Sequence, residues 1–296
     1  MEPAFSTDQM TNPVPREVLI WDTSAINGLA KVSNRRNLIA KLSNTGVIHR
    51  IPMYVFDEVA ATQNEETRTL LLKTCRELKG DSEMIILLSP WRVIEAGIRM
   101  FWEVGTVDWE ILLGPIAEYE EALESGRVFD QELAKIQKKQ NRDNLKRFED
   151  YVVQSKAQFA ALFQANLDRS EAVDGFVHRA NATDLVRKNA RYYCQAVLRT
   201  TVESRDLERF LVEFPPMRAN IYAFLLAHYE RNRSAKPSSP AGAIDLLASV
   251  YLPLCHKFVT DDQEQQKVLR EVTRCCSLLA EVVWFSGALG ENCDRC

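Results

Sequence analysis

Short runs rich in apolar residues alternate with longer amphipathic stretches up to residue 90. The apolar runs lie at 18–21, 47–51 and 84–88, and each has the length of a short buried strand. Between them, apolar residues recur at helical spacing over 26–42 and 53–79. Strands that alternate with helices in this way are typical of parallel sheets, so the pattern predicts an α/β fold.

A long helical block interrupts this alternation. Residues 91–233 contain no strand pattern, and such a length is too great for a loop, so it predicts an inserted all-helical subdomain. We expect helices at about 91–103, 108–125, 128–167, 182–204 and 217–231, with breaks at Gly114-Pro115, Ser125-Gly126 and Pro215-Pro216.

The alternation of strands and helices resumes after a polar, proline-bearing linker at 233–240. An apolar helix is expected over 241–252, a strand at 258–259, a helix over 263–279 and a last strand at 281–285. The sequence therefore predicts one discontinuous α/β domain with a mainly parallel sheet of about five strands. It comprises residues 16–90 and 238–287, with a disordered lead-in at 1–15, the helical insertion at 91–233 and a tail at 288–296.

The charge and composition are those of an ordinary globular protein. The 296 residues carry a net charge of −4, so bulk charge gives no indication of nucleic-acid binding, although a local patch could still provide it. No apolar run is long enough to span a bilayer, and the N-terminus does not have the pattern of a secretory signal. The seven scattered cysteines suggest reduced thiols. We expect a cytoplasmic protein with no membrane partner.

Four carboxylates stand where a parallel sheet would bring them together. Asp22 directly follows the first strand and Asp262 follows the fourth, while Glu58 lies early in the helix after the second strand. Asp245 lies on an apolar helix, where burial is costly unless the charge is compensated. Clustered carboxylates are stable together when a hard divalent cation neutralises them, and oxygen ligands favour Mg²⁺ or Mn²⁺. Such a site is suited to phosphodiester hydrolysis.

These residues also carry a resemblance to a known family. Four segments occur in order: Val18–Ser24, the Pro-x-x-Val-x-x-Glu segment Pro52–Glu58, Asp245 on its apolar helix, and Phe258–Asp262 with its Thr-x-Asp spacing. With them the chain resembles the PIN domain, a family of metal-dependent nucleases. The resemblance implies a three-layer sandwich around a parallel sheet and an endoribonuclease activity. It implies catalytic and metal-binding roles for Asp22, Glu58, Asp245 and Asp262, supported by Ser24, Thr260 and Asp261.

Ordinary structural roles compete with the catalytic ones. Asp22 could be a helix N-cap, a position at which aspartate is favoured. Asp57 could take the role of Glu58. Asp261 and Asp262 compete for one role, because either could cap the following helix, and the Thr-x-Asp spacing favours Asp262.

Polar residues beside the strands have similar alternatives. Thr23 or Ser24 is expected to cap the helix after the first strand. His256, just before the fourth strand, could be a general base, but a histidine at a strand edge is the favoured interpretation.

Two basic stretches at helical spacing lie in the insertion and could contact a phosphate backbone, with neighbouring tyrosines stacking on bases. The alternative, which we favour, is a solvated helix face. The candidate nucleic-acid contacts are Lys138, Lys139, Arg142, Arg187, Lys188 and Arg191.

Three functions are consistent with this sequence. The four carboxylates favour an endoribonuclease. The size of the insertion leaves open an inactive PIN-like scaffold that binds RNA or a protein partner through the insertion, which could also mediate a homo-oligomer. A structure-selective DNA nuclease is the third alternative.

Overall fold

The computed structural model describes most of the α/β part of the chain and part of the helical block. The lead-in predicted at 1–15, and all but the first residue of the tail predicted at 288–296, lie outside the described residues. The described residues are 17–80, 86–112, 117–125, 185–233 and 246–288, with single residues at 136, 139, 143 and 175.

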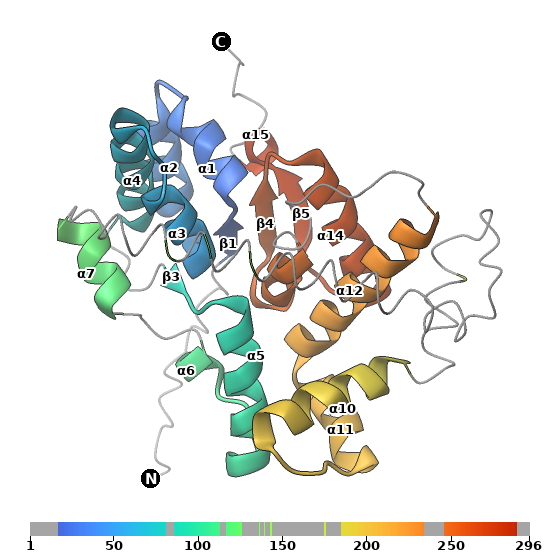
Figure 1. Cartoon of the computed structure of the whole chain (residues 1–296). Helices are drawn as coiled ribbons and strands as arrows, with labels where there is room; N and C mark the ends of the chain where they lie inside the picture. Colours follow the sequence, from blue (N-terminus) through green and yellow to red (C-terminus); the bar gives the residue numbers. More distant parts are fainter. Residues whose placement is uncertain are drawn as a thin grey trace, which may run out of the picture.

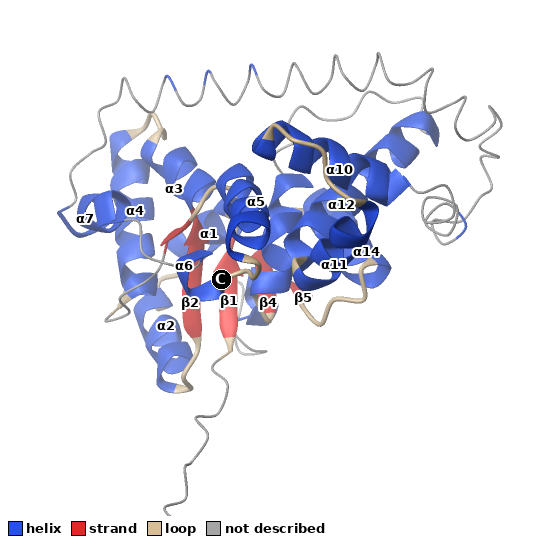
Figure 2. Cartoon of the chain, turned by 90° about the horizontal axis from the view of Figure 1, so that it is seen from below, coloured by secondary structure: helices blue, strands red, loops and turns tan. Residues whose placement is uncertain are grey.

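Five parallel strands form one sheet in the order β3-β2-β1-β4-β5. The central strand, β1, pairs on both sides: Leu19 lies opposite His49 of β2 and Lys257 of β4. Figure 2 shows β2, β1 and β4 side by side. The predicted α/β class and the five-stranded parallel sheet are confirmed. The strands are β1 (Val18–Trp21), β2 (Ile48–Pro52), β3 (Ile86–Leu87), β4 (Lys257–Thr260) and β5 (Glu281–Trp284).

Each of the two helices predicted between the first three strands is a pair of helices. Asn34 ends the turn before the second helix, and Asn64 caps the fourth by accepting a hydrogen bond from the Thr67 backbone N–H at 2.8 Å. The single-helix predictions are wrong here, because each joined two apolar stretches across a polar gap: no apolar residue lies at 33–37 or at 62–69. The helices are α1 (Thr23–Ala30), α2 (Arg35–Asn44), α3 (Met53–Ala60) and α4 (Glu65–Lys79).

The helices around the last two strands are shorter than predicted. A 3₁₀ helix, η2 (Ala248–Leu254), replaces the end of the α-helix predicted over 241–252, and it contains Pro253, which cannot donate an α-helical hydrogen bond. Helix α14 (Gln263–Cys275) ends four residues early, in a turn where Ser277 has a φ of 52°. Phe285 begins the short helix α15 (Phe285–Ala288) and does not extend β5.

The helical block contains more and shorter helices than expected. The break at Pro215-Pro216 is confirmed, since one helix ends at Glu213 and the next begins at Pro215. The helix predicted at 128–167 lies outside the described residues apart from three single positions. The described helices are α5 (Pro90–Arg99), the π-helix η1 (Met100–Val104), α6 (Trp109–Leu112), α7 (Ala117–Ser125), α10 (Leu185–Leu198), α11 (Ser204–Glu213) and α12 (Pro215–Arg233). None of the described helices combines the length and the apolar character that a membrane crossing requires.

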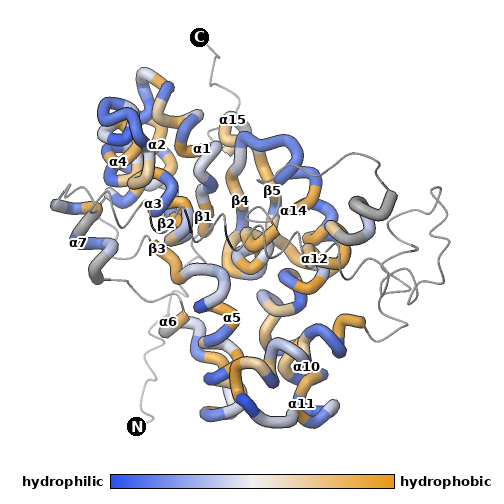
Figure 3. The backbone as a smooth tube through the Cα atoms, viewed as in Figure 1, coloured by the Kyte–Doolittle hydropathy of each residue, from blue (hydrophilic) through white to orange (hydrophobic). Residues whose placement is uncertain are grey.

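The helical block and the sheet share one hydrophobic core. Helix α12 packs on α14 and η2, and α5 packs on η2 and α10. Figure 1 shows α12 beside α14. Gly97 of α5 makes close packing possible, because a Cβ there would lie 2.3 Å from the ring of Phe214. Phe210 stacks on Phe214 with ring centroids 5.2 Å apart. Figure 3 shows hydrophilic and hydrophobic positions alternating along α4 and α14, as expected for helices with one buried face.

A buried histidine lies inside the sheet. Trp21 Nε1 donates a hydrogen bond to Nδ1 of His49 at 3.1 Å, which requires a neutral ring with its proton on Nε2. That buried Nε2 has no hydrogen-bond partner among the described residues. Burial, with a smaller contribution from Arg50, lowers the pKa of His49 from 6.5 to about 4. The fold therefore excludes the proton that an unfolded histidine would bind.

This exclusion predicts a pH-dependent stability. Between pH 6.5 and 4 the unfolded state binds a proton at His49 that the folded state does not, so stability is complete above pH 6.5 and falls as the pH falls. His49→Asn keeps an acceptor near the Nδ1 position but does not titrate. We expect the free energy of unfolding of the parent to lose about 2–3 kcal/mol more than that of the variant across this range. Urea unfolding at pH 7, 5.5 and 4 measures it, and parallel pH profiles would contradict it.

Candidate active site

Asp22 occupies the carboxyl end of the central strand. Its backbone N–H donates to the Val259 carbonyl at 2.9 Å, which extends the pairing of β1 with β4. Its side chain, in a residue only 6% exposed, caps α1 by accepting from the Ser24 N–H at 3.1 Å. Asp22 is therefore the N-cap, and the expectation that Thr23 or Ser24 caps this helix is wrong.

The Asp22 carboxylate is buried among neutral groups. Oδ2 also accepts from the Ser24 hydroxyl at 2.9 Å, and the Tyr54 hydroxyl lies 3.5 Å from Oδ1. Burial raises the pKa of Asp22, and hydrogen bonds from Ser24, Thr23 and Gln265 offset only part of this rise. Its contacts in the described part of the chain include no lysine, arginine or histidine. A cation at this position would therefore compensate a costly negative charge.

Glu58, on α3, is held at the same edge by a residue in the first turn of α1. The Thr23 hydroxyl donates to Oε2 of Glu58 at 2.5 Å, so the residue after Asp22 holds the second acid. Asp57, the alternative to Glu58, instead accepts a hydrogen bond from the Tyr119 hydroxyl at 3.1 Å. Burial raises the pKa of Asp57 to about 6. The two neighbouring acids thus face different helices, and Glu58 is the one bonded to Thr23, the residue that follows Asp22.

Hydroxyl groups join the ends of β1 and β4. The Ser24 and Thr260 hydroxyls lie 3.0 Å apart, and Ser24 Oγ accepts from the Asp261 backbone N–H at 2.8 Å. Thr260 Oγ1 in turn accepts from the Asp262 N–H at 3.1 Å. The predicted supporting residues Ser24 and Thr260 are thus in direct contact, although they are far apart in sequence.

Asp261 and Asp262 have different environments. Asp262 is partly buried and caps α14, with Oδ1 accepting from the Gln265 N–H at 2.9 Å. Asp261 is exposed, and its backbone N–H makes the contact with Ser24. Asp262 therefore has the cap role foreseen as an alternative, and one of its oxygens is already used by the helix.

The strand order gives this edge a particular position. Chain connections leave β1 toward β2 on one side and leave β4 toward β5 on the other. Such a reversal opens a crevice between the carboxyl ends of the two strands, where open α/β sheets bind ligands. Asp22 lies at the end of β1, and Asp261 and Asp262 follow the end of β4.

Two residues of this network were not singled out from the sequence. Thr260 donates to the side-chain carbonyl of Gln265 at 2.6 Å, and Gln265 is also hydrogen-bonded to Asp22. Tyr54 lies beside Asp22 from the start of α3. Helical spacing could have indicated both, because Gln265 lies one turn after Asp262 and Tyr54 one turn before Glu58.

Other candidates are not brought to this edge. Asp245 lies outside the described residues. His256 lies at the opposite end of β1, where Nδ1 accepts from the Val18 N–H at 3.0 Å, as favoured for a strand-edge histidine. Within the described ranges, no three histidine, cysteine, aspartate or glutamate residues are grouped closely enough to hold a metal ion.

The basic residues of the insertion are only partly described. Lys138 and Arg142 lie outside the described residues, whereas Lys139 and Lys188 are exposed. Arg187 is paired with Glu208 at 3.0 Å, and Arg191 donates to the Ser204 hydroxyl at 2.8 Å, so both fit the solvated helix face that we favoured.

Comparison of the chain with protein-family models, with curated proteins and with solved structures found no match. The assignment of a function therefore rests on the residues and the geometry of this edge.

The hydroxyl bridge predicts a measurable contribution to stability. Ser24→Ala removes contacts to Asp22, Thr260 and Asp261, and leaves a buried carboxylate with one donor fewer. We expect a loss of about 1–2 kcal/mol in the free energy of unfolding. Urea unfolding measures it, with Ser43→Ala on the exposed side of α2 as the matched control. Equal stability of the two variants would contradict the bridge.

Proposed function

We propose that this chain is a metal-dependent endoribonuclease that hydrolyses phosphodiester bonds at a PIN-type site. The observation that supports this most is the buried, uncompensated Asp22 carboxylate at the reversal point of the sheet. The next residue, Thr23, donates a hydrogen bond to Glu58. Ser24 donates to Asp22 and lies beside the Thr260 hydroxyl. Carboxylates gathered at the carboxyl ends of parallel strands suit hydrolysis of a phosphodiester.

The donor set fits Mg²⁺ or Mn²⁺, since it offers carboxylate oxygens with hydroxyl support. Asp22 and Glu58 would hold the ion, with Asp245 and Asp262 completing the ligand set inferred from the sequence. A bound divalent ion supplies acidification of a water nucleophile and neutralisation of charge on the phosphate.

The remaining residues act by positioning. Thr23 and Ser24 are neighbours in the first turn of α1, and they bond to Glu58 and Asp22 respectively. One helix turn thus fixes two acids relative to each other. Gln265 and Thr260 fix the β4 side of the same edge, so that Asp262 begins α14 next to it.

We further propose the three-layer arrangement. Connections between parallel strands are almost always right-handed. The helices from β1 to β2 and from β2 to β3 run in one direction across the sheet, and α14 between β4 and β5 runs in the other. Right-handed connections would therefore put α1–α4 on one face and α14 on the opposite face.

The direct test is cleavage of labelled single-stranded RNA and DNA with Mn²⁺, with Mg²⁺ and with chelator. We expect metal-dependent cutting of RNA that falls on the order of 10²-fold or more in Asp22→Asn, because the charge is lost while asparagine still caps α1. Glu281→Gln is the matched control, an exposed acid at the start of β5 on the opposite edge. Undiminished cutting by folded Asp22→Asn would contradict the assignment of the site. Preferential cutting of DNA would identify DNA, and not RNA, as the substrate.

A second pair of variants separates Asp262 from Asp261. Asparagine is also a good N-cap, so Asp262→Asn should keep α14 intact while losing about tenfold or more of the cleavage rate. Asp261→Asn, at an exposed side chain, should lose little. The same cleavage assay measures both, and the reverse order of effects would transfer the role to Asp261.

One observation favours a second candidate, the inactive scaffold. The acids in the described part of the chain do not form a group of three. In that case the chain would bind RNA or a protein partner without cutting. RNA binding in chelator, with no cleavage after Mn²⁺ is added, would support this candidate.

A further inference from the structure

The segment from Thr23 to Phe56 has an unusual charge for this chain. It contains no aspartate or glutamate, although the whole chain has 41 acidic residues and a net charge of −4. Helices α1 and α2 both lie in this segment. Its basic residues are Lys31, Arg35, Arg36, Lys41 and Arg50.

Helix α4 adds basic side chains to the surface of α2. The two helices are in contact, and Thr69, Lys73 and Arg76 recur on α4 at helical spacing, all of them exposed. Neither Lys73 nor Arg76 forms an ion pair with a described residue. The basic residues of α2 and the exposed Lys73 and Arg76 of α4 therefore lie on neighbouring helices.

These side chains line a continuous shallow trough between α2 and α4. It consists of two depressions, open to solvent, of about 380 and 410 Å³. Both are lined by Arg36 and Lys73, so they meet at these residues. The first is lined also by Thr69, Arg76 and Glu77, and the second by Ser33, Asn34, Arg35 and Asn37.

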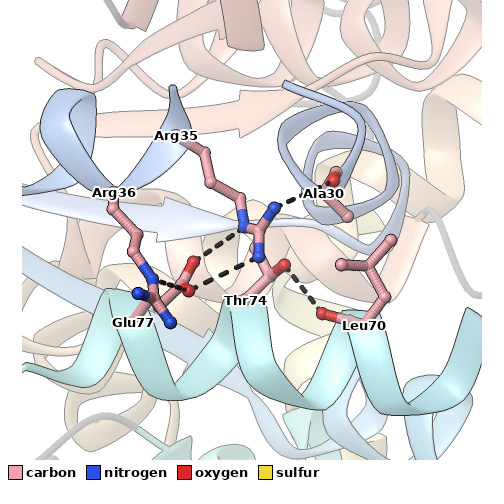
Figure 4. Close-up of polar contacts among 6 residues, drawn as sticks. All are labelled: Ala30, Arg35, Arg36, Leu70, Thr74 and Glu77. Carbon is pink, nitrogen blue, oxygen red and sulfur yellow. Dashed lines mark hydrogen bonds and ion pairs between the residues drawn. The ribbon is translucent and has the colours of Figure 1, made fainter. Parts of the chain in front are cut away.

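A single carboxylate, that of Glu77, holds Arg35 and Arg36 in place (Figure 4). Nε of Arg35 donates to Glu77 Oε2 at 2.7 Å, and Nε of Arg36 donates to Oε1 at 2.6 Å. The Arg35 side chain is only 13% exposed and also donates to the Ala30 carbonyl, whereas that of Arg36 is 68% exposed. The trough is lined by four basic side chains, those of Arg35, Arg36, Lys73 and Arg76, and by one carboxylate, so its net charge is positive. Fixing the guanidinium groups in advance lowers the entropy cost of binding an anion.

The shape and the lining identify the kind of ligand. An open trough cannot enclose a small molecule, but it can follow an extended polyanion. The hydroxyl and amide groups of Ser33, Asn34, Asn37 and Thr69 are suited to phosphate oxygens. None of the described residues that line it is aromatic, so bases would not be read by stacking.

We propose that the α2–α4 trough binds the sugar–phosphate backbone of single-stranded RNA, independently of sequence. The trough is separate from the candidate active site: α1, which Asp22 caps, leads away from the site to Ala30, beside Arg35. In Figure 2, α2 lies beside the lower end of β2, the end at which this strand begins. The trough would anchor a strand whose other part reaches the acids. The choice of RNA rests on the proposed function, whereas polyanion binding does not.

The test measures binding without cleavage. Fluorescence anisotropy of labelled single-stranded RNA and DNA is followed in chelator, at several salt concentrations, with the full chain. In Lys73→Glu/Arg76→Glu we expect affinity to fall on the order of tenfold or more, and the slope of log affinity against log salt to fall by about one. Lys73→Gln/Arg76→Gln should show a smaller loss in the same direction. Circular dichroism confirms folding, which exposed residues should not disturb.

The matched control is Arg92→Glu/Arg205→Glu, two exposed basic residues on α5 and α11. An equal loss in this control, or unchanged affinity in both trough variants, would overturn the proposal. Binding of phosphatidylserine vesicles that depends on the trough, without RNA binding, would also overturn it. Tighter binding of DNA than of RNA would overturn the choice of RNA.

If the trough binds RNA but no cleavage occurs, only the proposed function fails. If RNA is cut with unchanged affinity in the trough variants, only this inference fails.

Discussion

A buried carboxylate at the end of the central strand is the constraint around which the rest of the fold is arranged. Asp22 closes β1, its N–H bonds to β4 and its side chain starts α1. Removing its charge from water is costly, and neutral hydroxyl and amide groups recover only part of that cost. A residue needed only as a cap could remain solvated, since capping requires one accepted hydrogen bond. Its burial is the observation from which we propose a bound cation at this position.

The strand order then determines which distant residues meet Asp22. Because β4 pairs with β1, a segment more than two hundred positions later brings Thr260 within hydrogen-bond distance of Ser24. The helical block between them packs against the α/β part: α12 contacts α14, the helix that Asp262 caps. Packing at Gly97 and Phe214 links the block to the same core. The geometry of the acid edge therefore depends on helices distant from it in sequence.

The sequence was sufficient for the sheet but not for all of its surroundings. Short apolar runs predicted all five strands, since buried parallel strands need little else. The turns before Asn34 and Asn64 were missed because the apolar stretches on either side were joined into one helix, although a polar gap and the N-cap preference of asparagine both indicate a break. Asp22, Glu58 and Thr260 could be located from strand ends. Helical spacing could have indicated Gln265 and Tyr54 as neighbours of Asp262 and Glu58, but their hydrogen-bond partners depend on contacts between elements that no local pattern contains.

Electrostatics gives a reason for separating an acid edge from a basic trough. Carboxylates grouped at one edge repel a phosphate backbone until a cation arrives, and a net charge of −4 adds no attraction at long range. The attraction must come from a region where acids are absent, and the segment from Thr23 to Phe56 is such a region. One helix, α1, connects the two: it begins at the buried acid and leads to the arginines held by Glu77. A strand held in the trough would reach the acid edge at a high effective concentration, so weak and sequence-independent contacts would be sufficient to deliver it.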